Sequence, residues 1–314
     1  MKIQLLIIAL AITSLTGCAL FSTPLPTEQR LSEIEVERAL AGAASTSLQA
    51  ADRPSLRLLS LNMAHGRKDS FSQIFVNEIQ IRQNLAEIVE FLKRENADIV
   101  TLQEADSPSW WSGGFDHVAL LAREAGYAWY THANHVDNAF GTYGTAVLSR
   151  YPILRGYQVD FNPTPPTTRK GFTLAEIEWA PGGANGEKQV IDVVSVHLDF
   201  SRSSKRIEQI KDMKAVLGQR YNPTVVLGDF NSTWAEGDRE IQSLASVKRL
   251  KTHRPEANYL YTYSDDRFDW ILISKEFEFC NYYTAADILS DHLAVVSEIV
   301  AVHENTQLAG CSAI

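Results

Sequence analysis

The chain has 314 residues, of which 45% are hydrophobic and 21% are charged, so one large α/β domain or two small domains fit its composition. Its formal net charge of −9 excludes the basic surface of a dedicated nucleic-acid binder. It does not exclude a nuclease, because a bound divalent metal offsets negative charge locally.

The first 17 residues are predicted to be a lipoprotein signal peptide. Lys2 precedes an apolar stretch, Ile3–Ile12, that is too short for a comfortable membrane span. The next motif, Leu15–Cys18, resembles the bacterial lipobox, in which the cysteine is lipidated and becomes the mature N-terminus. An ordinary signal peptide with an incidental cysteine is the alternative. Ala19 after the cysteine resembles outer-membrane sorting, so we expect an anchored protein of the bacterial cell envelope, with the outer membrane favoured.

Residues 18–54 are predicted to be a tether, since they hold two prolines, many small polar residues and few large apolar ones. A short helix around Glu33–Leu40 is the one element considered within it. The folded domain is expected over residues 55–302, followed by a C-terminal tail at 303–314.

Two cysteines remain once Cys18 is assigned to the lipid. In an oxidising periplasm, Cys280 and Cys311 either pair and fix the tail or stay as free thiols. Sequence does not fix their geometry, so both alternatives stay open.

Hydrophobic periodicity predicts more strands than helices in the domain. The expected strands are Leu56–Met63, Ala97–Glu104, Tyr127–Tyr130, Thr145–Ser149, Phe172–Trp179, Val190–Leu198, Val225–Phe230, Phe268–Ser274, Cys280–Thr284 and Leu293–Val302. The expected helices are Asn77–Glu95, His117–Ala125, Ser204–Leu217 and Asp238–Lys248. Several strands are joined by short turns, such as Pro181–Glu187, so the sheets must be antiparallel or mixed, with helices on their outer faces.

Polar residues stand at the ends of these apolar strands. They are Asn62, Glu104, His197, Asp229, Asn231, Asp269, Asp291 and His292. Each one alone has a bland explanation as a turn or cap residue. Together they supply oxygen ligands for Mg²⁺ and a histidine whose tautomer a carboxylate can fix, which is the chemistry that phosphoryl transfer needs.

The motifs LNMAHG, LQEAD, GTAVLSRYPI, VHLD, GDFNS, FDWILIS and SDHLAV follow one another in an order that resembles the endonuclease/exonuclease/phosphatase superfamily. The resemblance covers about residues 55–302. It implies a four-layer α/β/β/α sandwich with two packed mixed β-sheets, and a Mg²⁺-dependent phosphoesterase, with Mn²⁺ as the alternative metal. Within this superfamily, the motif VHLD is more similar to secreted DNases, sphingomyelinases and lipid or sugar phosphoesterases.

The resemblance also assigns a role to each matching residue. Glu104 is the expected primary metal ligand, with Asn62 and Asp291 beside the metal. Asp229 and Asn231 are expected to orient the attacking water and the scissile phosphate.

Two histidines complete these assignments. His292, paired with Asp269, is expected to act either as base or as stabiliser of a phosphate oxygen. His197 is expected to contact the phosphate or assist the leaving group.

Three further residues, His135, Arg169 and Arg206, are predicted to contact substrate. For His135 the alternative is a zinc pair with His132, which has no obvious third ligand. For Arg169 and Lys170 a solvated loop is favoured over a phosphate contact. The pair Trp110-Trp111 either meets a membrane interface or a ligand, or packs in the core.

The sequence thus predicts an extracytoplasmic, lipid-anchored, Mg²⁺-dependent phosphoesterase that hydrolyses a phosphodiester or phosphomonoester. A lipid headgroup is favoured over nucleic acid as substrate. A secreted-type nuclease and a non-catalytic binding module on the same fold are the alternatives.

Overall fold

The computed structural model describes residues 31–39, 54–72, 75–139, 141–181, 186–235 and 239–302. The strands are β1 (Leu31–Ile34), β2 (Val36–Arg38), β3 (Ser55–Asn62), β4 (Ile99–Asp106), β5 (Trp129–Asp137), β6 (Thr142–Ser149), β7 (Ile153–Asp160), β8 (Gly171–Trp179), β9 (Gln189–His197), β10 (Thr224–Asp229), β11 (Asp269–Ile273), β12 (Phe277–Thr284) and β13 (Val295–Ala301). The helices are α3 (Glu78–Glu95), α4 (His117–Ala125), α5 (Ser203–Leu217) and α6 (Glu240–Ala245), with short 3₁₀ helices η3 (Ala64–Gly66), η5 (Trp110–Ser112) and η7 (Asn258–Leu260).

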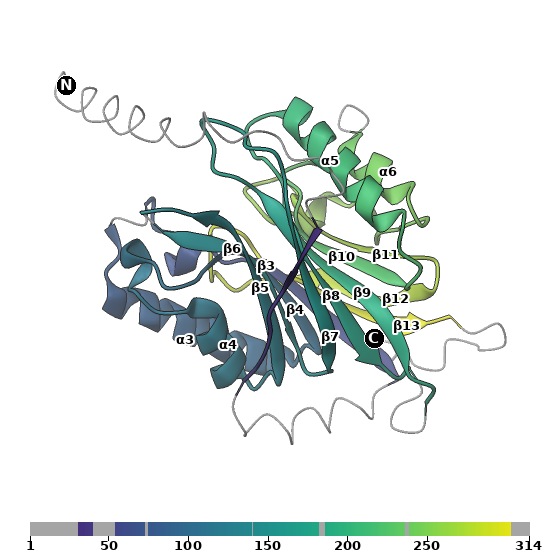
Figure 1. The fold of residues 1–314 in the computed structure, drawn as a ribbon, viewed down its shortest axis with the longest axis horizontal. Helices are drawn as coiled ribbons and strands as arrows, with labels where there is room; N and C mark the ends of the chain where they lie inside the picture. The colour runs from purple at the N-terminus through teal and green to yellow at the C-terminus, as the bar shows by residue number, and fades with distance from the viewer. Residues whose placement is uncertain are drawn as a thin grey trace.

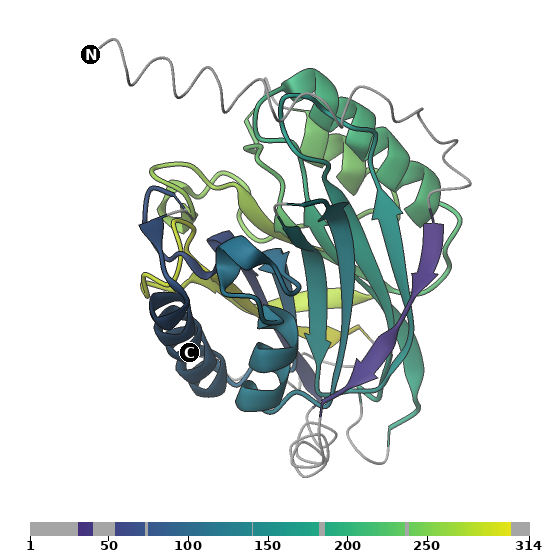
Figure 2. The same ribbon diagram turned by 60° about the vertical axis from the view of Figure 1, so that its left-hand side comes forward.

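Two β-sheets pack face to face at the centre of the molecule, and helices cover both outer faces (Figure 1). One sheet has the strand order β1-β7-β8-β9-β10-β11, and the other has the order β12-β13-β3-β4-β6-β5-β2. Both sheets are mixed, because β9 pairs parallel with β10 and β3 pairs parallel with β4. Helices α3 and α4 cover the seven-stranded sheet, and α5 and α6 cover the six-stranded sheet (Figure 2). The predicted four-layer α/β/β/α sandwich is confirmed.

Three apolar clusters fill the three interfaces between the four layers. Leu85 of α3 packs with Leu102 of β4 in the first cluster, and Trp179 of β8 packs between the sheets in the second. Met213 of α5 packs with Val226 of β10 in the third. Each such buried side chain contributes about 1.5–3 kcal/mol, so the layers are held together mainly by apolar burial.

Helices α3 and α4 form where the apolar periodicity predicts them. Asn77 caps α3 by accepting a hydrogen bond from the Gln80 amide, and the helix ends at Asn96 in the left-handed conformation. Gly126 ends α4 in the same conformation. These caps fix where both helices begin and end, and hence which residues face the sheet.

The expected helix around Glu33–Leu40 is wrong, because this segment forms strands β1 and β2. Leu31 pairs with Val159 of β7, and Val36 pairs with Thr131 of β5. The segment therefore crosses from the edge of the six-stranded sheet to the edge of the seven-stranded sheet. Pairing with two open strand edges outweighs the weak helical tendency of so short a segment. Residues 31–39 thus belong to the fold, whereas the rest of the predicted tether lies outside the described residues.

Strand β7 was not predicted, and β5 is longer than predicted. In β7 the buried residues Ile153, Gly156 and Val159 do not alternate, because a register shift follows Ile153 and because Val159 packs on the opposite face of the sheet, in the cluster with α5. The extension of β5 to Asp137 places His135 in a strand rather than in a loop.

Cys280 is disulfide-bonded, so the free-thiol alternative is wrong for this residue. The other two cysteines, Cys18 and Cys311, lie outside the described residues, as do the predicted signal peptide and the tail. Among the described residues, no helix is both long and apolar enough to span a membrane.

Candidate active site

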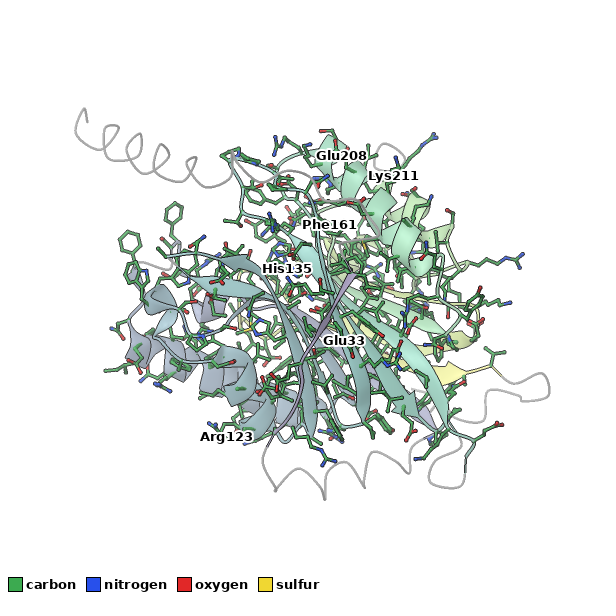
Figure 3. All side chains as sticks on the ribbon, viewed as in Figure 1. Glu33, Arg123, His135, Phe161, Glu208 and Lys211 are labelled. Atoms are coloured by element: carbon green, nitrogen blue, oxygen red, sulfur yellow. The ribbon has the colours of Figure 1, made fainter. Side chains whose placement is uncertain are left out.

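Strand ends from both sheets meet at one end of the sandwich. Asp229, the last residue of β10, pairs in register with His197 of parallel β9 and with Asp269 of antiparallel β11. Across the sandwich, the Asn62 Nδ2 atom at the end of β3 donates a hydrogen bond of 3.0 Å to the Asp229 Oδ2 atom. The fold thus joins side chains that are 167 positions apart in the sequence. Figure 3 shows His135 near this end and Arg123, in the last turn of α4, at the opposite end.

A glycine permits the close approach of β9 and β10 beside the site. Gly228 has a φ of +144°, and a Cβ atom at this position would lie 2.1 Å from the Val196 carbonyl oxygen. Only glycine fits there. The next residues on the two strands are His197 and Asp229, so this contact sets their separation.

The central feature of the site is a buried chain of His292, Asp269 and Asp229. The His292 Nδ1 atom lies 2.8 Å from Asp269 Oδ2, and its Nε2 atom lies 3.8 Å from Asp229 Oδ2. Burial lowers the pKa of His292, but Asp269 and Asp229 together raise it to about 10. The imidazole is therefore positively charged at neutral pH.

Asp229 titrates near neutrality in this setting. Its burial and the neighbouring charge of Asp269 raise its pKa to about 7, against the lowering effect of His292. Asn231 holds the carboxylate in place, since its backbone N–H donates a hydrogen bond of 2.9 Å to Asp229 Oδ1. The Asn231 Nδ2 atom in turn donates to the Leu198 carbonyl at 3.1 Å. Asp229 is thus oriented and able to exchange a proton near pH 7.

Glu104 projects into the site from a bulge in β4. Its φ is +49°, and the pairing of β4 with β6 shifts register at this residue. The side chain is 22% exposed and lies 3.4 Å from His65 Nε2, 3.9 Å from Lys170 Nζ and 3.9 Å from His197 Nε2. Burial raises the pKa of Glu104, but these basic neighbours lower it to about 2, so its carboxylate is ionised.

Two residues of the site, His65 and Lys170, were not among its predicted members: His65 was given no role, and for Lys170 a solvated loop was favoured over a phosphate contact. His65 Nδ1 lies 3.1 Å from Asp106 Oδ2, and its ring packs edge-on against Tyr143. Its place within the motif LNMAHG was the one signal for it.

Lys170 is buried, so the favoured solvated-loop interpretation is wrong for this residue. Its Nζ atom lies 3.4 Å from His197 Nδ1. Burial and this positive charge lower the pKa of His197 well below its usual value, so His197 is neutral.

Asp291 lies next to His292 and forms an ion pair with Arg67. Its Oδ1 atom accepts a hydrogen bond of 3.1 Å from Ser290 Oγ. Asp291 therefore stands at the border of the cluster, with an arginine as its partner.

The three predicted substrate contacts have partners outside the carboxylate cluster. His135 is buried, with Nδ1 2.7 Å from Asp160 and Nε2 2.9 Å from Thr145. Arg169 lies 3.8 Å from Asp160. Arg206 pairs with Glu240 at 3.3 Å.

The two tryptophans of the SPSWWSGG segment have different environments. Trp111 donates a hydrogen bond to Asp106 at 3.3 Å, and its ring lies 5.4 Å from the His65 ring. Trp110 is exposed. The pair therefore combines a packed residue beside the site with a residue that faces the solvent.

Asp229, Asp269 and His292 each place one ligand atom within 4.8 Å of the others, so the cluster can hold a divalent metal ion once the His292 imidazole has given up its proton. The Asp269 Oδ1 atom is buried and has no hydrogen-bond partner in the described part of the chain, which leaves a lone pair free. Carboxylate and imidazole groups are ordinary ligands of divalent cations, so the donor set fits.

Carboxylates, histidines and a lysine meet at one end of the two packed sheets, and this set of groups fits a metal-dependent phosphoester hydrolase. The profile of the Endonuclease/Exonuclease/phosphatase family matches residues 59–292, and the chain belongs to this family.

Solved structures support the same fold. The catalytic domain of human Nocturnin with bound sulfate has a TM-score of 0.60 and 19% identity, over 89% of this chain and 100% of that chain. A mannosyl-6-phosphatase from Bacteroides thetaiotaomicron has a TM-score of 0.56 and 17% identity, over 78% and 99%. D. rerio TDP2 with a single-strand DNA product has a TM-score of 0.57 and 14% identity, over 78% and 98%. A search of curated proteins gave no match.

Proposed function

We propose that the protein is a lipid-anchored, Mg²⁺-dependent phosphoesterase of the bacterial cell envelope that hydrolyses a lipid-linked phosphodiester or phosphomonoester. The observation that carries the catalytic part is the contact between Asp229 and His292, whose Oδ2 and Nε2 atoms lie 3.8 Å apart and whose pKa values are raised to about 7 and about 10. A group poised near pH 7 beside a fixed positive charge suits general-base attack on a phosphate.

Each group has a distinct task in this reaction. Asp229 takes the proton of the attacking water, while the backbone amide of Asn231 keeps the carboxylate oriented. His292 stays protonated through Asp269 and stabilises a phosphate oxygen as negative charge develops. His197 is neutral and lies 3.5 Å from Asp229, close enough to contact the same phosphate.

The proposed metal ligands are Glu104 and Asn62, with Asp291 beside them. This set consists only of oxygen donors, which Mg²⁺ prefers, and the low pKa of Glu104 keeps it charged. Mn²⁺ is the alternative, because carboxylate and carbonyl oxygens suit it as well. The bound metal would neutralise phosphate charge during attack.

A lipid-linked substrate is favoured by the acidic net charge and by the lipobox-like sequence that ends at Cys18. The similar structures bear names that refer to a mannosyl phosphate and to a DNA product, so the fold is compatible with more than one phosphoester. The nuclease therefore remains the second candidate. Its specific support is the similarity to the TDP2 structure with single-strand DNA.

The test is an assay of the full chain with Mg²⁺, with Mn²⁺ and with EDTA. The substrates are phosphatidylinositol and sphingomyelin vesicles, plasmid DNA, and small phosphomonoesters and diesters. Asp229→Asn should lower the rate by about 100-fold or more. Asp287→Asn is the matched control, since Asp287 pairs with Arg94, outside the cluster.

The outcomes separate the candidates. EDTA-sensitive release from lipid alone supports the proposal, and EDTA-sensitive nicking of DNA alone supports the nuclease. No hydrolysis of any of these substrates, together with no metal binding, would favour the non-catalytic binding module. Equal rates for Asp229→Asn and Asp287→Asn would refute the role given to Asp229.

A further inference from the structure

Large apolar side chains are exposed on the segments that follow β3, β4 and β9, three strands whose ends carry residues of the active site. Phe71 and Phe75, in the segment that follows β3 and η3, are 95% and 76% exposed. Trp110, in the segment that follows β4, is 69% exposed, and Phe200, three residues after His197, is 63% exposed. With the exposed Ile79 in the first turn of α3, these five residues are here called the apolar rim. Several large apolar side chains exposed on segments at the same end of a fold suggest an interaction surface there.

Trp110 connects the rim to the catalytic cluster through its neighbour Trp111. A groove is lined by Val76–Glu78 on one side and by Trp110, Trp111 and Gly113 on the other, so the segments after β3 and β4 lie side by side. Trp111 under this groove packs on His65, which contacts Glu104. A surface that covers the rim would therefore lie against the mouth of the site.

The N-terminal segment enters the fold at this same end. Leu31 pairs with Val159, Val159 pairs with Phe172, and Phe172 pairs with Val196, the residue before His197. Neighbouring strands lie about 4.8 Å apart, so these three pairings put Leu31 about 14 Å from Val196 across the sheet, at the same level along the strands. Cys18 precedes Leu31 by 13 residues, a connection that spans at most about 45 Å.

We propose that the apolar rim inserts into the interface of the lipid bilayer that carries the Cys18 anchor, and so presents the active site to lipid headgroups. This inference rests on the lipid anchor of the proposed function. Because the connection from Cys18 joins the fold at the end that carries the active site, this end can face the bilayer without the chain passing around the domain. Tryptophan and phenylalanine are the side chains that favour the bilayer interface.

The test uses the full chain reconstituted into phosphatidylcholine vesicles with and without brominated acyl chains, which quench tryptophan at the interface. The Trp110 signal is the difference between the wild type and Trp110→Phe. It should fall at least about two-fold in brominated vesicles. Tyr221→Trp is the matched control, because Tyr221 is 99% exposed and precedes β10, whose other end carries Asp229. Its added signal should stay unquenched.

A second variant reduces the apolar character of the rim without touching the core. Phe71→Ser with Phe75→Ser should restore most of the Trp110 fluorescence in brominated vesicles, since both side chains are solvent-exposed. Unchanged quenching in this variant would contradict insertion through the rim.

Flotation of the vesicles separates this inference from the anchor on which it rests, and neither readout requires hydrolysis. If the protein floats with the vesicles but Trp110 is not quenched, the lipid anchor is supported and insertion of the apolar rim is refuted. The same result with a dimeric mass would assign the rim to a second copy of the chain. Protein that stays in the aqueous phase overturns both.

Discussion

Replacing Asp269 by asparagine tests the electrostatic design of the site. The substitution keeps the shape of the side chain but removes the charge that lies 2.8 Å from His292 Nδ1. A hydrogen bond between buried charged groups contributes about 1.5–3 kcal/mol. At about 1.4 kcal/mol for each tenfold change in proton affinity, the pKa of His292 should fall by about 1 to 2.

The same substitution changes how stability depends on pH. The folded pKa of His292, about 10, lies above its usual value of 6.5, so its contribution to stability is complete below pH 6.5 and is lost as the pH rises through 10. Asp269→Asn should therefore lower the free energy of unfolding by about 1.5–3 kcal/mol at pH 6. The difference should shrink as the pH approaches 10.

The assay is an NMR titration of the His292 imidazole, with urea unfolding at pH 6 and pH 10, in EDTA so that no metal contributes. Asp287→Asn, at the exposed pair with Arg94, serves as the control and should leave the His292 titration unchanged. A His292 pKa that is the same in Asp269→Asn and the wild type would refute the reasoning. So would a destabilisation that is equal at both pH values.

Three further predictions concern the metal, the pH profile and the backbone. Glu104→Gln should lower Mg²⁺-dependent activity by about 100-fold or more, with weaker Mg²⁺ binding by calorimetry; unchanged binding would exclude Glu104 as a ligand. Activity should rise as Asp229 loses its proton near pH 7 and fall as His292 loses its proton near pH 10, and a flat rate profile over this range would contradict both assignments. Gly228→Ala should lower the free energy of unfolding by about 2 kcal/mol or more, because its Cβ would clash with the Val196 carbonyl; a melting temperature like that of the wild type would show that β9 and β10 can move apart.

Apolar periodicity predicted most of the strands and helices, because it reports which face of an element is buried, whereas the four-layer arrangement was predicted from the family resemblance. Helix α3 and strand β10 follow from that pattern directly. The polar strand ends were also visible, since Asp229 and His197 each interrupt an apolar run. The pattern could not show which of these ends meet.

The remaining features depend on contacts between distant segments. The bond from Asn62 to Asp229 exists only once the two sheets are packed, and the positive charge near Glu104 includes a lysine that sequence placed in a solvated loop. Strands β1 and β2 form because two strand edges are available to them, not because their own residues favour a strand. Local propensity carries no information on such pairing.

The segment Leu31–Arg38 has a consequence for how the purified protein behaves in solution. It covers the hydrogen-bonding groups of β7 in one sheet and of β5 in the other, so a single short piece of chain closes two sites at which strands of other molecules could add. A fragment that begins at residue 54, near the start of the domain that the apolar pattern predicts, would lack both β1 and β2 and would expose the edges of β7 and β5. Such a fragment should aggregate through its sheets even though its three apolar clusters are nearly complete, and a soluble form of the enzyme needs to retain the chain from Leu31 onward.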